Sequence, residues 1–174
     1  MNRYLQHFKT ITKHKYYVFH ACRKSGIPWR GITHDLSKYS IKEFVTSARY
    51  FTGTRSPIAK EKEENGYSVA WANNKGHNSH HWEYWTDWKD GELYCVKMPP
   101  TDLKELLCDW VGAGKAYSSK KWTQHDNLMY YLKNKHNMHL HEETRKTIES
   151  LLTTLDEYGE DDYFELVKNI EFFY

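Results

Sequence analysis

The sequence of 174 residues lacks paired cysteines, a block of like charges and any long apolar run. Its cysteines, Cys22, Cys95 and Cys108, are odd in number and show no CxxC spacing, so neither a disulfide scaffold nor a thiolate zinc site is indicated. No apolar run approaches the roughly 18 residues that a membrane span needs, and the N-terminus shows no apolar signal-peptide core. We therefore expect a cytoplasmic protein without a membrane partner.

Charge gives no reason to expect a polyanion as partner. The formal net charge is only +2 and the basic residues are dispersed, so polymeric nucleic acid is not favoured. What the chain has in abundance is 14 Tyr, 7 Trp and 11 His. Such side chains suit a lined pocket or an interface, with an aromatic core as the equal alternative. The length suits one domain over residues 1–174.

Apolar residues recur at helical intervals along most of the chain, which predicts an all-α fold of about seven helices. Asp90-Gly91 favours one short hairpin, with an ordered loop as the alternative. We expect a solvated connection at residues 60–64 and a close approach of another helix or a ligand at residues 112–114. The expected helical segments are 4–24, 40–53, 101–111, 122–135, 142–158 and 162–173. Residues 28–38 are expected to be helical or irregular, and residues 68–85, if helical, would place His77, His80 and His81 on one face.

In the first of these segments the apolar stripe is predicted to face the core and to carry His20 inward with it. The stripe consists of Leu5, Phe8, Tyr16, Phe19 and Cys22.

Histidines and carboxylates supply the chemistry that stands out. His34 and Asp35 are adjacent, and an imidazole beside a carboxylate can bind one metal ion together with it. Asp109 stands among apolar residues, where a carboxylate needs a partner such as a metal ion or a nearby lysine. Asp102 and Asp126 are alternative carboxylates for the same metal site. Nitrogen and oxygen donors suit zinc, iron, manganese and related ions, and Asp35 can bridge two of them. The inward-facing candidates are His20, His34, Asp35, His77, His80, His81 and Asp109.

The order H…HD…H..HH…D, with a lysine three residues after the HD aspartate, resembles the HD superfamily of metal-dependent phosphohydrolases, which are all-helical proteins. Within it, the segments HDLSK, SPxxxxxxxNGYSVAW, HHWEYW and CDW resemble an uncharacterised bacterial and phage family, over most of residues 4–140. The resemblance implies a single HD-domain-like helical bundle.

Carried over by position, the resemblance implies one or two divalent ions, of Mn, Fe, Co, Zn or Mg. His20 would be the first ligand, His34 and Asp35 the motif pair, and Asp109 the closing carboxylate. His77, with His80, His81 or both, would hold a second ion. Adjacent helical residues point about 100° apart, so only one of the last two is expected to face an ion well. The close spacing of residues 77–81 also leaves a mononuclear site open.

The resemblance further implies hydrolysis of a small phosphate ester, a nucleotide or cyclic nucleotide, by metal-activated water. Asp35 and Lys38 would be the catalytic residues, and Lys38 would lie near the substrate phosphate; Ser37 replaces the usual glycine before it, which can change the local turn. Arg23, Arg30 and Lys115 are further candidates for binding phosphate. The candidates for stacking on a base are Trp71, Trp82, Tyr84, Trp85 and Trp110, although Trp82 and Trp85 suit the core better.

Two other functions remain open from the sequence. One is a di-iron oxygenase on the same fold, because similar motifs with extra histidines occur in such superfamily members. The other is a non-catalytic, metal-stabilised binding protein. A separate histidine group, His136, His139 and His141, has no acidic partner nearby and is interpreted as solvated.

Overall fold

The protein is mostly helical, with a single small sheet in the described part of the chain. The structure is a computed structural model that describes residues 2–53, 55–118 and 121–174. Helices make up 73% of it. The α-helices are α1 (Arg3–Lys24), α2 (Pro28–Thr33), α3 (Ile41–Tyr50), α4 (Pro57–Asn65), α5 (Val69–His77), α6 (Pro100–Tyr117), α7 (His125–Asn134), α8 (Glu142–Tyr158) and α9 (Glu160–Lys168); the strands are β1 (Thr86–Lys89) and β2 (Glu92–Cys95).

The all-α prediction is confirmed, but the expected number of about seven helices is wrong, since the described residues form nine. The charged segment that we expected to be a solvated connection is part of α4. This helix begins with Pro57 in its first turn. It is capped after Asn65 by Gly66, whose φ of +80° is the left-handed geometry that favours glycine. The expectation of one domain over residues 1–174 remains a prediction.

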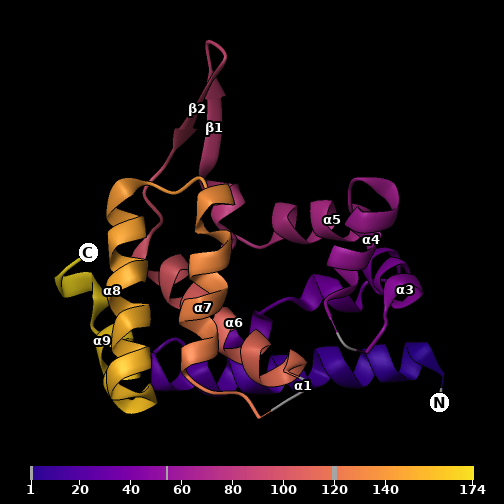
Figure 1. The fold of residues 1–174 in the computed structure, drawn as a ribbon, viewed down its shortest axis with the longest axis horizontal. Helices are drawn as coiled ribbons and strands as arrows, with labels where there is room; N and C mark the ends of the chain where they lie inside the picture. The colour runs from indigo at the N-terminus through magenta and orange to yellow at the C-terminus, as the bar shows by residue number, and fades with distance from the viewer. Residues whose placement is uncertain (1, 54, 119–120) are drawn as a thin grey trace.

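The predicted hairpin is confirmed. Asp90 and Gly91 both have positive φ, 54° and 83°, as a two-residue hairpin loop requires. They join β1 and β2 with Lys89 paired to Glu92 and Thr86 to Cys95. The hairpin projects beyond the helices at the top of Figure 1. No helix in the described residues is long and apolar enough to cross a membrane.

Helix α1 packs along α6, and this contact determines which face of α1 is buried. The face differs from the predicted one: Leu5, Phe8 and Tyr16 are 48%, 46% and 60% exposed. A Cβ added to Gly112 of α6 would lie 2.4 Å from Val18 Cγ2, so the close approach expected there is present. The buried residues of α1 are His7, Ile11, His14, Val18, Ala21 and Cys22.

The remaining core joins α6 to the C-terminal helices, which stand side by side in Figure 1. Trp82 and Trp85 pack partly buried against this core, as the sequence favoured. In α6 and the C-terminal segments the fully buried aliphatic residues are Leu103, Leu107, Ile148, Leu152, Leu155, Val167 and Ile170.

Acid is predicted to destabilise the contact between α1 and α3 through His7. This imidazole is buried against Phe44 and Phe51, and burial, with a smaller effect of Lys38, lowers its pKa from 6.5 to about 4. Between these values only the unfolded chain binds the proton. The free energy of unfolding should therefore fall as the pH decreases from about 6.5 to about 4, by at most about 3 kcal/mol.

Urea unfolding across this pH range checks the prediction. His7→Phe keeps a ring but cannot bind a proton, so its stability should depend less on pH than that of the wild type. The control is His136→Phe, at an exposed position. An unchanged pH dependence in His7→Phe would contradict the role of this imidazole.

Candidate metal centre

Four side chains of types that bind metals come together from three segments at the buried face of α1. His14 comes from the buried face of α1, His34 and Asp35 follow α2, and Asp109 lies in the middle of α6. Each is 9% exposed or less. The contact of α1 with α6 therefore supplies two members of the group, and the chain after α2 supplies the others.

The turn after α2 presents His34 and Asp35 together. Helix α2 starts at Pro28 and ends at Thr33, and Asp35 takes the left-handed conformation with φ of 52°. Asp is among the residues that adopt this conformation most readily. The backbone then continues into a 3-10 helix, Leu36–Tyr39, in which the amide of Lys38 donates to the Asp35 carbonyl over 3.0 Å. The adjacent side chains can thus face one point.

The donor atoms of the group have the spacing of metal ligands. His14 Nε2 lies 3.3 Å from His34 Nε2, 3.6 Å from Asp35 Oδ2 and 3.1 Å from Asp109 Oδ1. His34 Nε2 lies 3.1 Å from the same Asp35 oxygen and 3.3 Å from that of Asp109. Four donors bound tetrahedrally at about 2.0–2.1 Å from one ion would stand about 3.3–3.4 Å apart. The residues present therefore fit a divalent ion.

Electrostatics within the group favour a cation. Burial opposes ionisation of Asp35, but the nearby charges of His34 and Lys38 hold the pKa of this carboxyl well below its usual range. Burial likewise opposes ionisation of Asp109, whose pKa is lowered by hydrogen bonds from His14 and His34. Both carboxylates are thus ionised in the interior, where an uncompensated negative charge is costly.

A second group of candidate ligands lies at the other oxygen of Asp35. Asp35 Oδ1 is 3.8 Å from His80 Nε2, and this nitrogen has no hydrogen-bond partner among the described residues. Asp35, His80 and His81 together form another set of donors close enough to share an ion. The two oxygens of Asp35 therefore face two different sets of ligands, as the predicted bridging role requires.

Asn74 distinguishes His80 from His81. Its Nδ2 donates to Asp35 Oδ1 over 3.1 Å and to Glu43 Oε1 over 3.0 Å, so its Oδ1 is left to face His81 Nε2 at 2.6 Å. An amide oxygen only accepts, so His81 Nε2 carries the proton. Burial, chiefly, lowers the pKa of His81 to about 3, which keeps the ring neutral. Of the adjacent histidines, His80 has the free Nε2.

Residues 68–85 do not form one helix, so His77, His80 and His81 do not share the helical face that a continuous helix would have given them. Helix α5 ends at His77, because Asn78 is extended with φ of −123°, and His80 and His81 lie in the following turn. His77 is exposed, and its Nδ1 contacts the Asn73 carbonyl oxygen over 2.7 Å. The structure therefore brings His80 and His81 to the centre and leaves His77 outside it.

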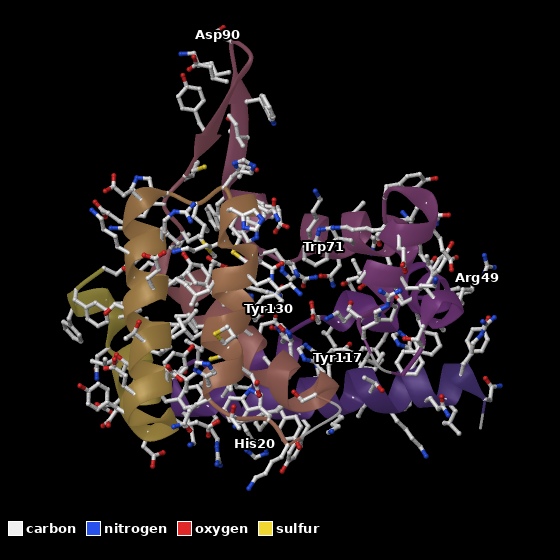
Figure 2. The ribbon with its side chains drawn as sticks, viewed as in Figure 1. His20, Arg49, Trp71, Asp90, Tyr117 and Tyr130 are labelled. Atoms are coloured by element: carbon white, nitrogen blue, oxygen red, sulfur yellow. The ribbon has the colours of Figure 1, made fainter. Side chains whose placement is uncertain are left out.

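His14, not His20, is the α1 histidine of the centre. His20 is half-buried and stacks edge-on against Tyr16, 4.4 Å between ring centroids. Figure 2 shows it at the lower margin of the molecule, while Tyr117 lies further inside. The sequence held a signal for His14, since Ile11 and Val18, three residues before and four after it, share its helical face.

Only some of the predicted phosphate-binding residues lie at the centre. Lys38 forms an ion pair with Asp35 at the centre, and its side chain is 19% exposed. Arg30 lies close by, but its guanidinium is held by Asp102 and Glu105 and is not available to a phosphate. Arg23 is exposed at the end of α1. Lys115 pairs with Glu160 outside the centre.

Besides His14, two residues of the centre were missed in the sequence. Glu105 of α6, 3% exposed, contacts His34 Nδ1 over 2.9 Å. Its spacing of four residues from Asp109 places both on one helical face, which is the signal that the sequence offered. Asn74 is fully buried in α5 and carried no comparable signal.

The chain belongs to a protein family described as a family of unknown function (DUF5662), whose pattern matches residues 3–154. No curated protein and no solved structure matches it. The matched range includes every residue of the centre.

Replacing His14 is predicted to remove the metal ion, whereas replacing His20 is not. The two residues lie on the same helix but roughly 120° apart around its axis. His14→Ala deletes a ligand, so the affinity for Mn²⁺ or Zn²⁺ should fall by more than the roughly 10- to 100-fold that outer contacts cost. Titration calorimetry with both variants checks this. Equal affinities in the two variants, or a loss confined to His20→Ala, would contradict the assignment.

Proposed function

We propose that the protein is a metal-dependent phosphohydrolase that acts on a small phosphate ester, a nucleotide or cyclic nucleotide. The observation that carries the proposal is the set of donor atoms from His14, His34, Asp35 and Asp109, in which each histidine Nε2 lies 3.1–3.6 Å from the other and from one oxygen of each carboxylate, with Lys38 beside them. The same residue types in the same order underlie the resemblance to the HD superfamily, with His14 in place of His20.

His14, His34, Asp35 and Asp109 would hold one ion, and His80 with the second oxygen of Asp35 would contribute to another. A divalent ion supplies a lowered pKa for bound water and positive charge for phosphoryl oxygens. The buried carboxylates fix the position of such an ion, and the protein interior around them limits competing water.

Lys38 is suited to bind the phosphate. Burial opposes its charge, but the neighbouring Asp35 carboxylate raises the pKa of its ammonium group, which therefore stays protonated. The side chains of Lys38 and Asp109 are 19% and 12% exposed, whereas those of His14, His34 and Asp35 are 3% exposed or less, so a substrate would approach from the side of Lys38 and Asp109. Its ammonium is a compact charge that pairs with phosphate oxygens.

Aromatic side chains near the centre support a nucleotide as substrate. Trp71 stacks edge-on against His81 with 4.6 Å between centroids, and Tyr117 lies 6.1 Å from the His14 ring. Aromatic rings of this kind can stack on a base. Figure 2 shows Trp71, Tyr117 and Tyr130 around the same central part of the molecule.

The closure of the centre favours a second candidate, a non-catalytic protein stabilised by metal. Four protein ligands complete a tetrahedral zinc site, and closed sites are typical of structural ions. Catalysis at this centre therefore needs an ion with more than four ligands, such as Mn²⁺, which retains positions for water and substrate. A di-iron oxygenase on the same ligands is distinguished by a mixed-valence paramagnetic signal after anaerobic iron loading.

Turnover is predicted with Mn²⁺, Co²⁺ or Fe²⁺, and little with Zn²⁺. The assay uses nucleotides, cyclic nucleotides and an aryl phosphate, each with protein loaded with a single metal. Lys38→Gln removes a charged hydrogen bond of about 1.5–3 kcal/mol, so kcat/KM should fall about 10- to 100-fold. Lys146→Gln, on the surface of α8, is the control. Metal binding without turnover of any substrate would favour the non-catalytic candidate.

A further inference from the structure

One carboxylate contacts two neighbouring histidines that face different oxygens of Asp35, His34 at Oδ2 and His80 at Oδ1. Glu105 is 3% exposed, and its Oε1 lies 2.9 Å from His34 Nδ1 and 3.1 Å from His80 Nδ1. Its other oxygen, Oε2, pairs with Arg30 Nε. Both oxygens are thus engaged, and a single oxygen serves two imidazoles that come from segments 46 positions apart in the sequence.

These contacts determine where each imidazole holds its proton. An ionised carboxylate only accepts hydrogen bonds, so both Nδ1 atoms must donate to it. A metal ion would take the place of any proton on Nε2, because an imidazole that keeps its proton on Nδ1 offers the Nε2 lone pair as ligand. His34 Nε2 faces His14, Asp35 and Asp109, whereas His80 Nε2 faces Asp35 Oδ1 and has no hydrogen-bond partner in the described residues.

We propose that Glu105 is a positioning residue that orients both His34 and His80, so that their Nε2 atoms face metal ions bound at the two different oxygens of Asp35. The inference rests on the proposed metal centre. Partners that fix a ligating histidine through its second nitrogen usually influence one ligand. Here one carboxylate sets two ligands, which predicts that its loss weakens both metal positions together.

Glu105 is itself held in place by a charged cluster that reaches the turn carrying His80. Arg30 of α2 pairs with both Glu105 and Asp102 of α6. The hydroxyl of Ser79, immediately before His80, donates to Asp102, and Arg30 contacts the same hydroxyl oxygen over 3.2 Å. Because Arg30 is held by these carboxylates, it is not counted among the residues that would bind phosphate.

The test replaces Glu105 and measures metal binding and imidazole protonation separately. In Glu105→Gln, the amide oxygen cannot serve Arg30 and the two imidazoles at once; Glu105→Leu removes the acceptor entirely. Glu61→Gln is the matched control, since Glu61 is a buried carboxylate, 2% exposed, that accepts from Ser68 and from the Val69 amide. Zn²⁺ stoichiometry and affinity are measured by calorimetry, and histidine tautomers by ¹⁵N NMR of the zinc-loaded protein.

We expect the wild type to bind two ions, with Nδ1 protonated in His34 and His80. Both Glu105 variants should bind each ion about 10- to 100-fold more weakly, with altered tautomers, whereas Glu61→Gln changes stability alone. Should Glu105→Leu fail to fold, Glu105→Gln decides the matter. Wild-type affinities and tautomers in Glu105→Gln would overturn the inference and leave the metal centre standing. A wild type that binds no ion would overturn the proposed function, and this inference with it.

Discussion

The burial of the Asp35 carboxylate is the constraint on which the rest of the centre depends. An ionised carboxylate in the interior is costly unless charges or hydrogen bonds compensate it. Here His34 lies 3.1 Å from one oxygen and Asn74 3.1 Å from the other, and Lys38 completes an ion pair. Asn74 belongs to α5, and His34 in turn contacts Glu105 of α6, so the polar network around Asp35 extends into both helices.

The packing of α1 on α6 turns this local arrangement into a site. Because Gly112 has no side chain, the helices approach closely at Val18, one turn of α1 beyond His14. Asp109 lies one turn before Gly112 on α6, so the same contact that fills the core brings His14 and Asp109 to 3.1 Å. Core packing and the geometry of the candidate metal centre are therefore coupled: a change in the distance between the helices would also change the spacing of the candidate ligands.

Local signals were enough to predict much of the chain. The Asp90-Gly91 turn gave the hairpin, and the periodicity of residues 142–158 gave α8 with its bounds. His34, Asp35 and Asp109 lie together as the motif suggested. Helix α1, however, has apolar residues on more than one face, so its own sequence does not decide which face is buried. Its buried face is set by α6, which selects His14 over His20. Glu105 and Asn74 were missed because their contacts are mostly with residues of segments distant in the sequence.

We propose that His14, His34, Asp35 and Asp109 bind a divalent ion. An anomalous difference map from crystals of the Mn²⁺-loaded protein tests this binding most directly, because the signal locates the metal without reference to activity. We expect a peak within about 2.0–2.3 Å of one donor atom from each of the four residues. Crystals that contain manganese only at surface carboxylates, with no peak among these four side chains, would contradict it.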